Sequence, residues 1–167
     1  LLQKLGSTRK CVSAADYERL ARQTPGLRVA AAKALPAYDP AEPTGISRTP
    51  TVTVVVVPSG SGTACPLPDE RFLQAVSAQL NRWRPIGTQV RVIPPVYIGI
   101  SVRAAVSGGE TAEAVRLVRQ YLAQVGIGGT VRVEDIAACL QTMSGAERVG
   151  RIDVQVSGSG CRQNSAG

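Results

Sequence analysis

The sequence offers few groups that could carry out enzymatic chemistry. The chain of 167 residues contains no histidine, so a Ser-His-Asp triad, a Cys-His pair and an imidazole metal ligand are all excluded. Two acidic pairs, Asp69-Glu70 and Glu134-Asp135, stand where helices are expected to begin, and carboxylates there interact favourably with the helix dipole. We therefore expect no catalytic residue, no metal site and no cofactor, and no enzymatic activity.

The four cysteines do not form a metal or redox motif. Cys11, Cys65, Cys139 and Cys161 are separated by 54, 74 and 22 positions, unlike the close pairs of a zinc ribbon or a CxxC site. Cys139 lies in an apolar helical run and is predicted to be a small buried hydrophobic residue. A disulfide between the Gly/Ser-rich loops of Cys65 and Cys161 is possible in an oxidising compartment. We expect free thiols, because a chain with 44% hydrophobic residues can build a core without crosslinks.

Two glycine-rich segments lack the context of a phosphate-binding loop. Residues 59–62 follow an apolar strand but lack the Gly-Lys-Ser/Thr ending, and residues 126–129 follow a helix instead of a strand. Both are predicted to be ordinary loops.

The net charge of +7 does not point to nucleic acid. Sixteen of the nineteen cationic residues are arginines, and they are scattered from Arg9 to Arg162. Nucleic-acid-binding proteins usually combine a clustered basic face with aromatic side chains for stacking, and this chain has only six aromatic residues. We expect no nucleic acid partner, and no membrane span, because no apolar run approaches the roughly 18 residues that a bilayer requires.

Periodicity predicts an α+β fold of two small strand-and-helix modules with mixed sheets. The first module, residues 1–94, is expected to contain a helix capped by Ser13, with Asp16 at the third helical position, and a strand at 27–35. A central strand at 52–57, a helix from about residue 68 with its apolar face on one side, and a strand at 89–93 follow. The segment 36–50 has four prolines and no periodicity, which indicates an exposed loop of the kind that often makes contacts.

Pro94-Pro95 is the predicted domain boundary, since two adjacent prolines cannot donate hydrogen bonds to a sheet. The second module, residues 95–157, is expected to contain the elements listed here: a strand at 97–106, a helix at 111–125, a short extended piece at 130–133, a helix at 134–143 and a strand at 149–156. Residues 158–167 form a polar Gly/Ser tail. Because residue 1 is Leu and no signal peptide is visible, we expect this chain to be a piece of a longer one.

Several segments, in order, resemble one protein family. They are Val12-Ser-Ala-Ala-Asp-Tyr-Glu-Arg-Leu-Ala21 with residues 24–34, the strand at 52–58 of type V-x-V-x-V-V-P, the helix at 73–85, the run Ile86-Gly-Thr-Gln-Val-Arg-Val-Ile-Pro-Pro-Val-Tyr-Ile-Gly-Ile-Ser-Val102, and the pieces at 130–140 and 145–149. The ordered set, spanning about residues 10 to 156, resembles the J-type baseplate wedge proteins of contractile phage tails and contractile injection systems.

The resemblance implies a structural wedge subunit that links the central hub to the sheath and relays the contraction trigger. It implies six copies, or six heterodimers, in a hexameric assembly. The implied partners are other wedge subunits, the sheath and the hub or spike proteins. It also implies assembly in the bacterial cytoplasm into a phage-tail-like particle that can be released.

Interfaces favour arginine and aromatic residues, so two groups are candidate protein contacts: Tyr38 with Arg48, and Trp83 with Arg82 and Arg84. An exposed loop tyrosine and a core tryptophan between solvated arginines are the simpler interpretations of these groups. A free-standing adhesion or carbohydrate-binding module, and a small-molecule enzyme without histidine, remain alternative functions.

Overall fold

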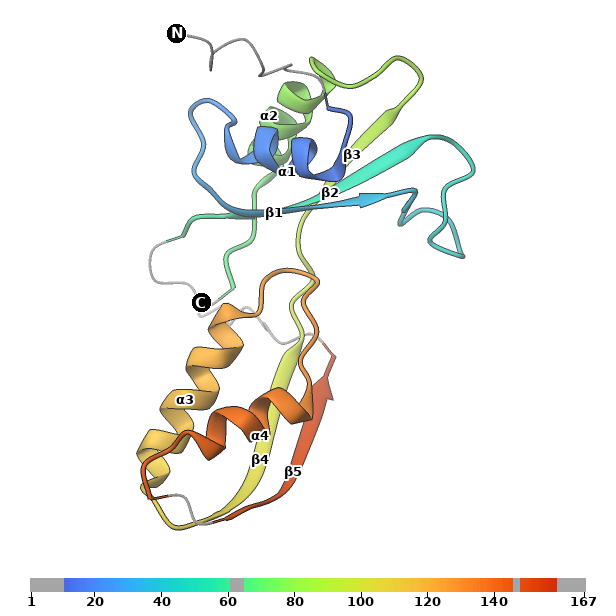
Figure 1. Ribbon diagram of the computed structural model, residues 1–167. Coiled ribbons are helices and arrows are strands. Elements are labelled where there is room, and N and C mark those ends of the chain that lie inside the picture. The colour runs from blue at the N-terminus through green and yellow to red at the C-terminus, as the bar shows by residue number, and fades with distance from the viewer. Residues whose placement is uncertain (1–10, 61–64, 146–147, 159–167) are drawn as a thin grey trace, which may run out of the picture. The chain divides into compact units, whose positions relative to one another are not determined.

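The computed structural model describes residues 11–60, 65–145 and 148–158 (Figure 1). The chain divides into two compact units, one ending at Pro95 and one beginning at Val96, and each is described by itself. Helices and mixed sheets confirm the predicted α+β class. Cys161, residues 61–62 of the Gly/Ser segment, and the predicted tail after residue 158 lie outside the described residues.

The first unit is a three-stranded sheet with two helices (Figure 1). Its elements, in chain order, are α1 (Ala14–Arg22), β1 (Val29–Pro36), β2 (Thr51–Pro58), α2 (Glu70–Asn81) and β3 (Gln89–Ile93). The strand order is β1-β2-β3, with β1 antiparallel and β3 parallel to β2. The parallel strands β2 and β3, joined through α2, form a strand-helix-strand crossover, and β2 has the predicted central place.

Side chains fix where both helices begin. The hydroxyl of Ser13 accepts a hydrogen bond from the Asp16 amide at 3.3 Å, and the Asp16 carboxylate accepts one from the Ser13 amide at 3.0 Å, which completes a capping box. Asp69 caps α2 by accepting from the Phe72 amide at 2.7 Å. Both caps lie where the sequence predicts the start of a helix. A side-chain oxygen at such a position satisfies a backbone amide that has no partner within the helix.

The core lies between the helices and one face of the sheet. Val54 and Val56 of β2 pack with Val76 and Leu80 of α2, and all four are fully buried. Phe72, Leu73 and Trp83 lie partly buried against this cluster, as the apolar periodicity of α2 predicts. The other face of β2 is also covered, since Thr51 and Thr53 are buried as well.

The second unit is smaller and less closely packed. Its elements are β4 (Gly99–Ser107), α3 (Thr111–Gln124), α4 (Val133–Gln141) and β5 (Arg148–Ser157), and β4 pairs antiparallel with β5. Helix α4 packs on β5 and α3 packs on α4. Arg132, within the predicted extended piece at 130–133, has extended backbone and is the N-cap residue of α4, which begins at Val133, one residue earlier than predicted. An acidic first turn, Glu134 and Asp135, favours starting the helix there.

Replacing Ser13 by Ala tests the capping box. Hydrogen bonds from the Ser13 backbone and hydroxyl, then from the Val12 amide, lower the pKa of Asp16 below its ordinary value of 3.8. The Asp16 carboxylate therefore stabilises the fold at pH values above its ordinary pKa of 3.8. This stabilisation is lost as the pH falls through the lower pKa that the group has in the folded protein. We expect Ser13→Ala to raise the Asp16 pKa part of the way back, as measured by NMR titration of the carboxyl carbon. An unchanged pKa would contradict the capping box; Ser101→Ala, an exposed serine of the second unit, is the control.

Candidate functional site

The loop joining β1 to β2, residues 37–50, folds against the sheet face opposite the helices. The Thr53 hydroxyl donates to the Tyr38 carbonyl at 2.6 Å, while the neighbouring Val54 side chain enters the helix-covered core. Asp39 belongs to this loop and is only 6% exposed. We call residues 37–50 the β1–β2 loop, and it accounts for the second covered face of β2.

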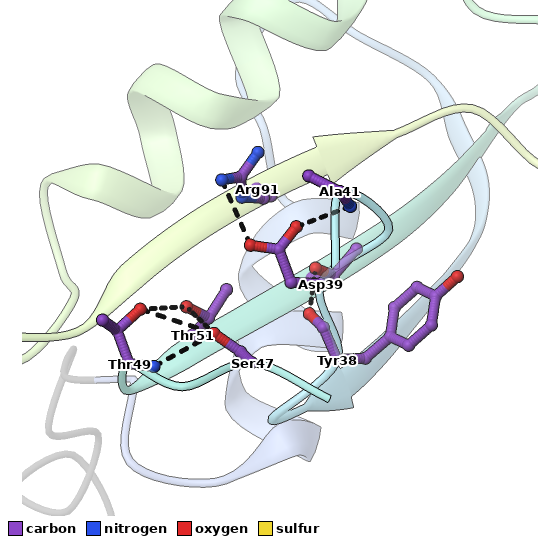
Figure 2. Close-up of polar contacts among 8 residues, drawn as sticks. Tyr38, Asp39, Ala41, Ser47, Thr49, Thr51 and Arg91 are labelled. Carbon is purple, nitrogen blue, oxygen red and sulfur yellow. Dashed lines mark hydrogen bonds and ion pairs between the residues drawn. The ribbon is translucent and has the colours of Figure 1, made fainter. Parts of the chain in front are cut away.

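Asp39 holds the β1–β2 loop in one conformation (Figure 2). Its carboxylate accepts a hydrogen bond from the Ala41 amide at 2.9 Å and forms an ion pair with Arg91 of β3 at 3.1 Å. The Asp39 amide donates to the Gly45 carbonyl at 3.0 Å. Because the carboxylate is buried, both of its contacts are needed to offset its desolvation.

Three hydroxyls fix the return of the loop to β2 (Figure 2). Ser47 donates to the Thr51 hydroxyl at 2.9 Å, and the Thr49 and Thr51 hydroxyls lie 3.1 Å apart. The Ser47 amide donates to the Ala37 carbonyl, and the Ala37 amide donates to the Thr51 carbonyl, both at 2.8 Å. These bonds hold Ala37 at φ +59°, a conformation that L-residues with a side chain rarely adopt.

Tyr38 and Ile46 face outward from this framework as neighbours across an antiparallel bridge. Tyr38 is 37% exposed and Ile46 is 66% exposed. The Tyr38 ring lies over Gly45, where an added Cβ would come within 3.1 Å of the ring and where φ is +68°. A glycine is thus required at position 45, and the loop presents an apolar pair on a fixed backbone.

The structure places the two predicted contact groups on opposite sides of the first sheet. Tyr38 and Arg48 lie in the β1–β2 loop, and Arg48 is exposed. The other group follows α2 on the helix-covered side. There Arg82 and Arg84 are exposed, and the Arg84 guanidinium donates to the Thr88 carbonyl.

Trp83 packs partly buried against the core, and its carbonyl accepts from the Cys11 amide at 3.0 Å. Much of the indole is therefore structural. Whether the rest of it contacts a partner stays a prediction.

Sequence reasoning missed Asp39 and Arg91, the pair that orders the loop. The available signal was local: an aspartate two residues before Ala41 in a proline-rich segment is typical of a turn held by its own carboxylate. Nothing local identifies Arg91, because the two residues are 52 positions apart and meet only through the sheet.

The cysteines differ from the expectation of free thiols. Cys65 is disulfide-bonded, so the expectation was wrong for this residue, whereas Cys11 and Cys139 are free. A sequence cannot reveal such a pairing, because it depends on which loops meet in space. Cys11 is fully buried, and burial, followed by the charge of Asp16, raises the pKa of its thiol to about 11. Its thiol is therefore protonated and unreactive at neutral pH.

Residues 11–60, 65–145 and 148–158 contain no group of three or more histidine, cysteine, aspartate or glutamate residues arranged to hold a metal ion. No helix among them has the length and apolar character needed to cross a bilayer.

Comparison with known proteins identifies the class as that of the baseplate proteins. A family model described as "Baseplate J-like central domain" matches residues 9–93, just over half of the chain, which includes the whole sheet of the first unit and the β1–β2 loop. The chain belongs to this family. The predicted resemblance to the J-type baseplate proteins of contractile phage tails and contractile injection systems is thereby confirmed.

Among solved structures, a chain in the cryo-EM structure of the anti-feeding prophage (AFP) baseplate, 6-fold symmetrised, has a similar fold. The TM-score is 0.64 at 13% sequence identity, and the match covers 92% of this chain and 35% of that one. The present chain thus spans about a third of the length of that protein. A search of curated proteins found no match.

Replacing Asp39 by Ala tests the framework of the loop. The change leaves the Ala41 amide without its partner and Arg91 without its ion pair, and we expect the free energy of unfolding to fall by about 1–3 kcal/mol. Most of the loss comes from the buried carboxylate, since the exposed end of Arg91 is screened by solvent. Urea unfolding followed by fluorescence of Trp83, the single tryptophan, measures it.

Glu42→Ala is the matched control for this experiment. It removes the same charge from the same loop, and we expect a change within about 0.5 kcal/mol. Equal losses in the two variants would contradict the assigned role of Asp39.

Proposed function

We propose that this chain is a structural segment of a wedge subunit in the baseplate of a phage-tail-like contractile injection system. In this role it bridges the central hub and the sheath and relays the contraction trigger. It performs no chemistry of its own. The observation that carries the proposal is the family match over the first unit, supported by a similar fold over 92% of the chain in a baseplate structure.

The proposed partners are other wedge subunits, the sheath and the hub or spike proteins. The similar solved structure is of a baseplate described as 6-fold symmetrised, which supports six copies, or six heterodimers, in the assembly. We further propose that the particle is assembled in the bacterial cytoplasm and can then be released.

The site supports a role in binding by surface. The β1–β2 loop is held by buried polar contacts on one side and presents Tyr38, Ile46 and Arg48 on the other. A preorganised loop loses little conformational entropy when it binds, so more of its contact energy appears as affinity. We propose that this loop contacts one neighbouring subunit, and that Arg82 and Arg84, with the accessible part of Trp83, contact another.

Purification of the native particle tests the proposed function. The full-length protein, tagged and expressed in its host, is expected to co-purify with sheath and hub proteins in assembled particles. A protein that is recovered only as a monomer, from cells that do assemble particles, would contradict the proposal.

Charge reversal and truncation test the two contact groups. We expect Tyr38→Ala, Arg48→Glu and Arg82→Glu each to lower the fraction of subunit found in particles, by about ten-fold where the residue is a binding hot spot. Arg28→Glu reverses the charge of an arginine that is also exposed but lies outside both groups, and it is the control. Normal incorporation of all three variants would remove these residues from the interface.

A further inference from the structure

Among the residues that the structure describes, β3 has a row of backbone groups without hydrogen-bond partners at the edge of the first sheet. The Gln89 amide donates to the Pro50 carbonyl at 2.7 Å, so Gln89 faces β2. Backbone direction alternates along a strand, and the register Thr53↔Arg91 therefore turns Arg91 toward β2 as well. The amides and carbonyls of Val90 and Val92 point the other way, toward the open edge.

This open edge is sharply bounded. At one end the Thr88 carbonyl accepts from Arg84 and the Thr88 amide donates to the Pro85 carbonyl. At the other end Pro94 has no amide hydrogen to donate. Within the part of the chain that the structure describes, the four outward groups of Val90 and Val92 have no protein hydrogen-bond partner.

The opposite edge of the same sheet is partly blocked. The Ala34 amide of β1, which points away from β2, donates to the Glu18 carboxylate of α1 at 3.1 Å, and Lys33 lies 3.5 Å from the same carboxylate. Pro36 removes a further donor from that edge. Such contacts protect edge strands in native proteins. Within the described residues, no side chain makes an equivalent contact with the Val90 or Val92 amide.

A shallow, open groove lies beside Val92 of this edge and has room for side chains. It has a volume of about 420 Å³ and lies between α2 and β3, lined by Leu73, Gln74, Ser77, Ala78, Asn81 and Val92. The lining contains no charged residue, and Ser77 and Ala78 are small. An extended segment paired with β3 would place every second side chain toward this groove.

We propose that the open edge of β3 and this groove accept an extended segment of a neighbouring subunit, which adds a fourth strand to the sheet. The neutral, partly apolar lining fits a segment that is uncharged and has apolar side chains at alternate positions. Main-chain hydrogen bonds to Val90 and Val92 supply affinity, and the groove supplies selectivity. This inference rests on the proposed function, because it takes the neighbour to be a subunit of the same baseplate.

Hydrogen exchange measures the added strand directly. In assembled particles we expect the Val90 and Val92 amides to exchange about ten-fold or more slowly than in the isolated full-length protein. The Arg91 amide, which faces β2, is the internal control and is protected in both states. Equal exchange of Val90 and Val92 in the two states would overturn the inference. So would protection already present in the isolated protein, because the edge would then be covered by the chain itself.

A pair of variants on α2 tests the groove without altering the sheet. Ala78 lines the groove and Ala75 does not, and both are exposed on the same helix. We expect Ala78→Arg to lower incorporation into particles by about ten-fold and Ala75→Arg to leave it unchanged. Equal incorporation of the two variants would overturn the inference. Because the wild-type protein would still be found in particles in that case, the proposed function would stand.

Discussion

The burial of β2 on both faces is the constraint on which the first unit depends. A strand of consecutive β-branched residues, Thr51 to Val57, can be dry only if both sides of the sheet are covered. The helices α1 and α2 cover one side and the β1–β2 loop covers the other. The loop is therefore part of the fold as well as an exposed surface. Its buried polar contacts hold it against the sheet.

That constraint also separates the roles within the loop. Asp39 and the Ser47 hydroxyl face the sheet and hold the backbone, whereas Tyr38, Ile46 and Arg48 remain exposed. Rigid presentation of a few large side chains is what an assembly protein requires, because ordering a loose loop at every interface would weaken the assembly. Together with the open edge of β3, the loop gives the first unit two separate surfaces that we propose as contacts for neighbouring subunits.

Local patterns predicted most of the fold. Features that depend on residues close together in the chain can be recognised in the sequence. They include the Ser13 and Asp69 caps, the apolar stripe of α2 and the β-branched run of β2. The boundary before α4 is shifted by one residue, because Val133 continues the alternation of the extended piece in the sequence but belongs to the first turn of the helix together with Glu134 and Asp135.

The site was harder to predict, because its decisive contacts are between residues far apart in the chain. The Asp39–Arg91 ion pair needs β3 to lie beside β2, and the disulfide of Cys65 needs a second cysteine to lie beside it in space. The tryptophan illustrates a second difficulty, since apolar periodicity indicates that Trp83 packs inward but does not say how much of the indole remains accessible.

The most direct test of the account is a cryo-EM reconstruction of the native particle at a resolution that traces the main chain. The account predicts that the three-stranded sheet of the first unit fits density in the baseplate, between hub and sheath, with one additional strand from a neighbouring subunit beside Val90 and Val92. A complete baseplate map in which no density accommodates this unit would contradict the account.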